Sequence, residues 1–148
     1  MLNVPPPVWS LAYVLAATAL SYWAGWPRVP GLPLVPLAVL LIVVGISLSV
    51  TAVVLFRREG TELNPASTTN RKLVTRGPFS LTRNPMYLAI VITTLGIAFW
   101  VGAWPMFLAP LAVFATANWM NVPFEEASMR RQFGAEFDAY VSRVRRWI

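Results

Sequence analysis

Uncharged apolar stretches alternate with short polar breaks along this chain, and their lengths are those of membrane-spanning helices. Residues 9–26 carry no charged side chain and have a tryptophan at each end, and residues 34–56 form a second uncharged stretch rich in leucine and valine. A helix needs about 20 apolar residues, and at least about 17, to cross the hydrocarbon core of a bilayer. Both stretches are therefore predicted to be membrane spans, joined by a short turn around Arg28.

A third uncharged stretch, residues 84–124, is too long for a single span. At about 1.5 Å per residue, a helix of this length would reach roughly 60 Å, twice the thickness of a bilayer core. Gly102 and Pro105 lie near its middle, where they favour a tight turn. The stretch is therefore predicted to form two spans, residues 86–102 and 105–122, which pack as a helical hairpin.

The remaining segments are polar or amphipathic. Residues 57–85 hold Asn-Pro and Gly-Pro steps, which favour loops. In residues 123–148 apolar side chains recur every three or four positions and charged side chains occupy the other faces, which is typical of a helix on a membrane surface. Gly134 is expected to divide this segment into two pieces. The pattern predicts an all-α integral membrane protein: one domain, residues 1–148, with four transmembrane helices, a loop at 57–85 and an amphipathic C-terminal segment at 123–148.

Charge sets the expected orientation in the membrane. Only 12% of the residues are charged, against about 25% in soluble domains, and the net charge is +6. Eleven of the twelve Lys and Arg residues lie in the loop and the C-terminal segment, and Arg28 is the exception. An excess of basic residues marks the cytoplasmic side of a membrane protein. We therefore expect both termini to be cytoplasmic, and the basic residues to serve topology and contact with membrane lipids rather than nucleic acid.

Composition also limits the chemistry. The chain has no cysteine and no histidine, so disulfides, thiolate-bound metals and an imidazole base are excluded, and no metal site is expected. Residues 1–9 hold no Lys or Arg. A signal peptide begins with a positively charged region, so the first apolar stretch is expected to remain in the mature protein.

The candidate functional residues gather on the predicted cytoplasmic face. Residues 83–85 open the third span, and Glu125 with Glu126 closes the fourth. Because the two spans form a hairpin, their outer ends are expected to lie close together. The C-terminal segment follows directly and can fold over them. These features predict a polar pocket that is roofed by this segment and open to lipid at its side.

A series of motifs runs from this region to the C-terminus. Its members are Gly60, Thr61, Pro65, residues 73–79, residues 83–88, Glu125, Glu126, Phe133, Gly134, Phe137, Tyr140 and residues 145–148. In this order the series resembles the isoprenylcysteine carboxyl methyltransferase family, which includes membrane phospholipid N-methyltransferases and many small bacterial relatives. The best-known members have histidine where this chain has Asn84.

The resemblance implies a function and a site. It implies S-adenosylmethionine as methyl donor, a cytoplasmic cofactor pocket in a bacterial inner membrane, and a lipophilic acceptor that arrives through the bilayer. The family's cofactor contacts carry over to Val74, Gly77, Pro78, Phe79, Arg83, Asn84, Pro85, Tyr87 and Leu88. Its catalytic acidic pair would be Glu125 and Glu126, followed by a basic residue at Arg130 or, as we prefer, Arg131.

Physical reasoning about the ligands agrees with this interpretation. S-adenosylmethionine needs a carboxylate for its ammonium group, a donor for its carboxylate and an apolar slot for its adenine, and the predicted residues include all three kinds of group. A carboxylate acceptor needs no base at neutral pH, whereas an amine acceptor must lose a proton, which a glutamate can take. The sequence leaves both heads open and slightly favours the carboxylate, because the chain has no histidine to act as a base.

Simpler interpretations exist for each motif. Residues 83–85 can be an ordinary helix start with proline at its first position, and the acidic pair can be charges at a membrane exit. A membrane reductase that binds NADPH shares a similar C-terminal region but usually has more spans. A non-catalytic module that binds lipid or a partner would bind neither nucleotide. The order and spacing of the motifs favour the methyltransferase.

Overall fold

The computed structural model describes residues 4–60 and 72–148, and all regular elements within them are helical. The all-α prediction is confirmed for these residues. The Asn-Pro step at residues 64–65, and Thr61 and Pro65 of the motif series, lie outside the described part of the chain.

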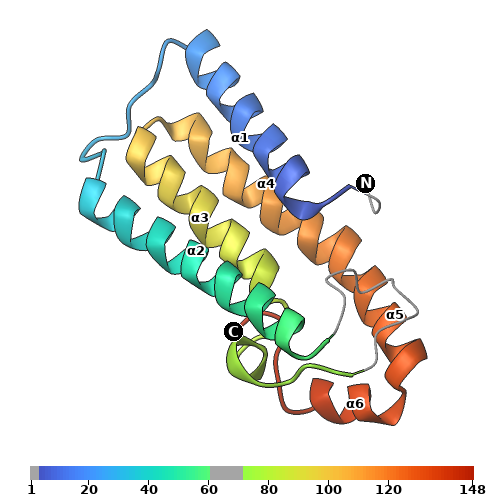
Figure 1. Ribbon diagram of the computed structural model, residues 1–148. Coiled ribbons are helices and arrows are strands. Elements are labelled where there is room, and N and C mark those ends of the chain that lie inside the picture. Colours follow the sequence, from blue (N-terminus) through green and yellow to red (C-terminus); the bar gives the residue numbers. More distant parts are fainter. Residues whose placement is uncertain (1–3, 61–71) are drawn as a thin grey trace.

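Helices that lie side by side make up the body of the molecule (Figure 1). The elements are α1 (Pro6–Trp23), α2 (Val35–Arg58), the 3₁₀ turn η1 (Gly77–Ser80), α3 (Pro85–Val101), the 3₁₀ turn η2 (Trp104–Phe107), α4 (Leu108–Thr116), the π-helix η3 (Ala117–Asn121), α5 (Val122–Phe133) and α6 (Ala135–Val141). Across the bundle the order is α1, α4, α3, α2, and α5 continues the line of α4 past the end of the other helices.

Local sequence signals explain where the helices begin and end. Helix α2 has a proline in its first turn and Arg57 and Arg58 in its last, where their charges complement the helix dipole. Helix α3 starts at Pro85 and ends before Gly102, whose φ of 71° is left-handed. A side chain at Gly102 would also come within 3.1 Å of the Leu32 Cβ atom. Proline and glycine therefore mark these boundaries for the reasons that the sequence indicated.

Helix α2 packs against α3 through two glycines. A Cβ atom on Gly45 would lie 2.8 Å from the carbonyl oxygen of Ala89, and one on Gly96 would lie 3.0 Å from that of Ala38. The missing side chains let the two backbones approach closely, as small residues do between membrane helices.

The outer faces of the bundle are apolar. Side chains that are more than half exposed along α1 and α2 include Leu11, Leu15, Leu40, Val43 and Val50. Soluble monomers rarely expose apolar patches larger than a few hundred Å². Two helical stretches, Val35–Arg58 and Trp104–Phe133, are long and apolar enough to cross a membrane, and Pro85–Val101 is a shorter apolar helix. The surface and these lengths indicate a membrane protein.

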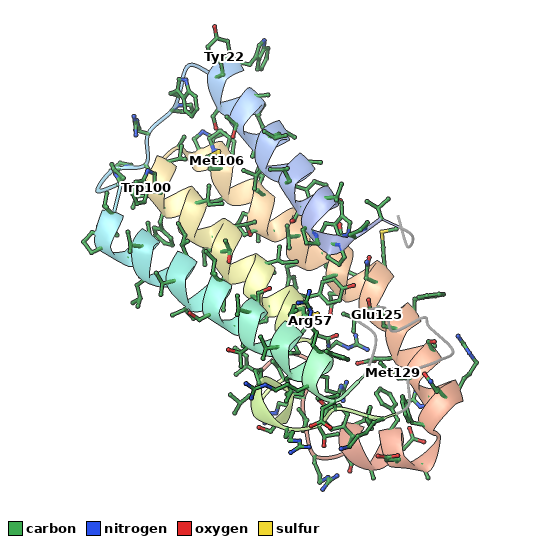
Figure 2. All side chains as sticks on the ribbon, in the orientation of Figure 1. Tyr22, Arg57, Trp100, Met106, Glu125 and Met129 are labelled. Carbon is green, nitrogen blue, oxygen red and sulfur yellow. The ribbon has the colours of Figure 1, made fainter. Side chains whose placement is uncertain are left out.

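The two ends of the bundle differ in character. At one end the connection between α1 and α2 packs on the turn between α3 and η2, where the Arg28 side chain donates to the Val101 carbonyl at 2.8 Å. The other end holds most of the charged side chains. Figure 2 shows Arg57, Glu125 and Met129 near this end, and Tyr22, Trp100 and Met106 near the opposite one.

Candidate active site

A cavity of about 820 Å³ lies at the charged end, where α2 ends and α3 begins. Its walls come from the prolines before and at the start of α1, the last turns of α2, residues 72–74, the first turns of α3, and helices α5 and α6. The volume falls within the range of about 300–1,000 Å³ that is usual for small-molecule sites.

The cavity gathers eight of the twelve residues predicted from the sequence. These are Val74, Phe79, Arg83, Asn84, Pro85, Tyr87, Glu125 and Glu126. The other four lie elsewhere. Gly77 and Pro78 form η1, where Gly77 has a positive φ of 62°. Leu88 lies one turn into α3, and Arg131 is exposed on α5.

Glu125 faces the cavity beside Tyr87. The Tyr87 hydroxyl donates to Glu125 Oε1 at 2.5 Å, and the buried Tyr87 ring stacks on Trp9 with centroids 6.4 Å apart. Among residues 4–60 and 72–148, no ion pair is formed by Glu125. Its carboxyl group therefore meets the cavity with a phenol as its neighbour rather than a cation.

Glu126 has a different environment, because two arginines hold it. Arg83 Nη2 lies 2.9 Å from Glu126 Oε1, and Arg146 Nη2 lies 2.6 Å from Oε2. The Glu126 and Arg83 side chains are only 15% and 11% exposed. The ion-pair partners of Glu126 are thus Arg83 and Arg146, and Arg146 lies twenty residues further along the chain. A role for Arg131 stays a prediction.

The C-terminal segment covers the cavity. Phe137 and Tyr140 of α6 line it, and the Tyr140 hydroxyl donates to the Phe79 carbonyl at 2.6 Å. Burial raises the pKa of Tyr140 to about 12. Further on, Asn84 Nδ2 donates to the Arg146 carbonyl at 3.0 Å, and Trp147 Nε1 to Asn118 Oδ1 at 3.0 Å. These contacts place α6 and the residues after it over the start of α3.

Several wall residues were not predicted. They are Ser49, Val53 and Phe56 of α2, Met86 of α3, Asn121 of η3, and Phe124 and Met129 of α5. Phe56 packs edge-on against Phe79, with ring centroids 5.0 Å apart. Asn121 ends a π-helix, a feature that is frequent at functional sites. Met86 lies within the motif at residues 83–88 but was not assigned to the site. No motif marked the other positions, because they reach the cavity through helix packing.

The side chains that line the cavity suit an amphiphilic, partly charged organic ligand. Phe56, Phe79, Met86 and Met129 give the walls flat and polarisable apolar surfaces. Two lining residues keep a buried polar atom without a partner in the described structure, a donor at Arg83 Nε and an acceptor at Asn121 Oδ1. Within the same described residues, no three acidic side chains come together as a metal site.

Comparison with known proteins identifies the family. A family model for phospholipid methyltransferases matches residues 34–136, more than half of the chain. A protein described as uncharacterized, from Haemophilus influenzae, is 29% identical over 63 residues, which are 43% of this chain and 100% of that protein. No solved structure matches. The chain therefore belongs to the phospholipid methyltransferase family, as its motif series indicated, and it is a membrane methyltransferase.

Proposed function

We propose that this protein transfers a methyl group from S-adenosylmethionine to the polar head of a lipophilic acceptor at the cytoplasmic face of the membrane. The family supplies the reaction type. The observation that carries the proposal is the cavity at the charged end of the bundle, which brings the motif residues, the acidic pair and the C-terminal segment together.

The proposed topology has four spans in one domain. Helices α1, α2, α3 and the apolar part of Trp104–Phe133 would cross the membrane. Arg28 lies at the opposite end of the bundle from the ten other basic residues that the structure describes. In the proposed orientation, which follows the positive-inside rule, the cavity and both termini would be cytoplasmic, and the family's small bacterial relatives suggest an inner membrane.

The cavity fits the proposed cofactor. The aromatic and methionine walls would hold the adenine, and the Glu125 carboxylate would accept from the ammonium group of the methionine part. Arg83 has less to offer a ligand than the sequence predicted, because both its terminal nitrogens already donate to protein oxygens. Its Nε–H, which has no partner within the described residues, remains as a donor. When bound, S-adenosylmethionine supplies an electrophilic methyl group.

An apolar groove supports a lipid acceptor. This groove of about 460 Å³ is bounded by α1, α2 and α3, and it shares Pro7, Ser49 and Ile90 with the cavity wall. The two spaces are therefore adjacent. A hydrocarbon tail could lie in the groove while the head, an amine or a carboxylate, reaches the cavity. Holding the head beside the donor is what accelerates such a transfer, because positioning replaces a chance encounter.

Cofactor binding in detergent or nanodiscs tests the proposal. S-adenosylmethionine and its homocysteine product should each stabilise the purified protein, by about 2.7 kcal/mol at a hundredfold excess over the dissociation constant. NADPH should have no effect. Stabilisation by NADPH alone would support a reductase, and no stabilisation by millimolar amounts of any nucleotide would support a non-catalytic module.

Glu125 should matter for turnover. Glu125→Gln keeps the shape but removes the charge that would hold an ammonium group or take a proton from an amine. We expect methyl transfer to fall tenfold or more, which corresponds to about 1.4 kcal/mol. Glu136→Gln is the matched control, because Glu136 is exposed on α6 and lies away from the cavity wall. Equal losses in both variants would point to a general effect of charge.

A further inference from the structure

Two adjacent acidic residues have unlike surroundings, and the difference suggests unlike roles. We propose that Glu126 is a positioning residue which, with Arg83 and Arg146, fastens the C-terminal residues over the cavity and leaves Glu125 as the acidic group that meets the ligand. The part of this inference that concerns ligand binding rests on the proposed function, whereas the part that concerns the C-terminal residues does not.

Glu126 is already occupied by protein donors. Its Oε1 accepts from Arg83 Nη2 at 2.9 Å and from Arg146 Nε at 3.2 Å, and its Oε2 accepts from Arg146 Nη2 at 2.6 Å. The Arg146 contacts form a two-pronged pair, which fixes direction as well as distance. Few lone pairs remain for a ligand.

Arg83 extends this link to the C-terminal residues. Its Nη1 donates to the carbonyls of Val141 at 3.2 Å and Val144 at 3.0 Å. Its backbone N–H donates to the Arg145 carbonyl at 3.0 Å. Arg83, just before α3, thus joins Glu126 of α5 to the backbone at the end of α6 and after it. Loss of Glu126 would remove a partner from both arginines at once.

The charges make Glu126 a poor partner for an ammonium group. Arg83, Glu126 and Arg146 together carry a net charge of +1, so the cluster repels a cation and attracts an anion. Glu125 has the Tyr87 hydroxyl as its partner and forms no ion pair within the described chain. An ammonium group in the cavity would therefore bind Glu125, and the cluster of Arg83, Glu126 and Arg146 would hold the C-terminal residues over the cavity.

Hydrogen exchange of the purified protein in nanodiscs, without ligand, tests the positioning role. Glu126→Gln and Arg146→Gln should each speed exchange of the amides of residues 141–148 tenfold or more. The double variant should exchange only slightly faster than either single variant, because each substitution removes the same link. Arg146→Lys keeps the charge but not the two-pronged contact, so it should speed exchange less than Arg146→Gln does. This variant replaces Glu126→Gln in the test if Glu126→Gln fails to fold.

Two controls separate this role from a general effect. Arg143→Gln removes a charge from the same segment, where Arg143 is exposed and, among residues 4–60 and 72–148, donates only to the Ala139 carbonyl. Glu125→Gln removes the neighbouring carboxylate. Both should leave exchange of residues 141–148 unchanged. Unchanged exchange in both Glu126→Gln and Arg146→Gln would overturn the proposal, as would equal acceleration by Glu125→Gln.

Kinetics and binding give the second readout. Glu126→Gln should raise the Kd for S-adenosylhomocysteine and the KM about tenfold and largely preserve kcat, whereas Glu125→Gln should raise the Kd and also lower kcat. A fall in kcat for Glu126→Gln, with the Kd and the exchange rates unchanged, would make Glu126 catalytic and overturn the proposal. If neither the wild-type protein nor any variant binds the nucleotide while the exchange results hold, the proposed use of S-adenosylmethionine fails and the positioning role stands.

Discussion

Glu125 and Glu126 are neighbours in the sequence, yet they meet different partners. Successive residues of an α-helix point about 100° apart, since a turn takes 3.6 residues. Glu125 turns toward Tyr87 on α3, and Glu126 turns toward Arg83 and Arg146. A motif that names both residues therefore locates the site, but it does not show which carboxylate is free to meet a ligand.

The Tyr140 hydroxyl offers a test of how α6 is held over the cavity. Its O–H donates to the Phe79 carbonyl at 2.6 Å, and both residues are buried. Tyr140→Phe would leave that carbonyl without its donor, so we expect a loss of about 1–3 kcal/mol in the free energy of unfolding. Thermal or denaturant unfolding in detergent measures it. Tyr22→Phe is the control, because Tyr22 is 76% exposed, and a similar loss there would contradict the explanation.

The same hydroxyl predicts a pH dependence. Burial raises the pKa of Tyr140 to about 12 in the folded protein, against about 10 in an unfolded chain. A raised pKa means that the stabilising contribution is complete below pH 10 and is lost as the pH rises toward 12. Tyr140→Phe should lack this part of the alkaline loss of stability. An unfolding profile that is identical in both proteins between pH 9 and 12 would contradict it.

Most of the predicted site residues line one cavity. They lie at or near helix ends, which sequence signals locate well. Pro85 and Gly102 bounded α3 to within a residue. Arg146 could not be assigned to Glu126 in the same way, since their contact depends on how the chain turns after Gly134 and α6. Asn121 was missed because nothing in the sequence marks the change from α-helix to π-helix at residues 117–121.

The close packing of α2 against α3 predicts how two glycine substitutions change the free energy of unfolding. Gly45→Ala and Gly96→Ala would each gain up to about 1 kcal/mol from helix propensity. The added methyl group, however, would press on a carbonyl of the facing helix at 2.8 or 3.0 Å, and overpacking costs about 1–3 kcal/mol. We therefore expect a net loss of stability in both variants, measured by thermal unfolding in detergent.

Ser47→Ala is the matched control for this contact. Ser47 lies two residues from Gly45 on α2 and its side chain is exposed. The substitution should change the free energy of unfolding little. If the glycine variants are as stable as this control or more stable, propensity outweighs the close approach and the packing explanation is wrong.

At the scale of elements the sequence left one connection unspecified. It predicted an amphipathic helical segment directly after the fourth span, without stating how the two join. In the structure α5 continues from α4 through the π-helix without a break, and the turn comes at Gly134, where φ is 52°. The prediction of a division at Gly134 is confirmed. The continuous helix carries Glu125 and Glu126 on a rigid element rather than on a loop.

Across the whole molecule, the distance between α1 and α2 creates the apolar groove. The two helices lie at the outer edges of the bundle, with α3 and α4 between them (Figure 1). The groove spans Pro7 to Val14 along α1, about 10 Å at about 1.5 Å per residue. Hydropathy alone predicted that these faces are apolar, but the groove depends on where α1 packs, which no local pattern determines.

This geometry predicts that the acceptor's tail decides its efficiency. A tail that moves from the bilayer into the groove stays in apolar surroundings, whereas each methylene exposed to water would cost about 0.8 kcal/mol. With labelled methyl donor in nanodiscs, an acceptor whose tail has about fifteen carbons should therefore react at least tenfold faster than one with about two and the same head, a difference of about 1.4 kcal/mol.

Ser49 lines both the groove and the cavity, so Ser49→Phe should fill the space where they adjoin. The variant should slow the long acceptor more than the short one. Ser47→Phe, on the exposed face of the same helix, should slow neither. If the short acceptor reacts as fast as the long one, or if both phenylalanine variants behave alike, the tail does not use this groove and the acceptor reaches the cavity from the aqueous side.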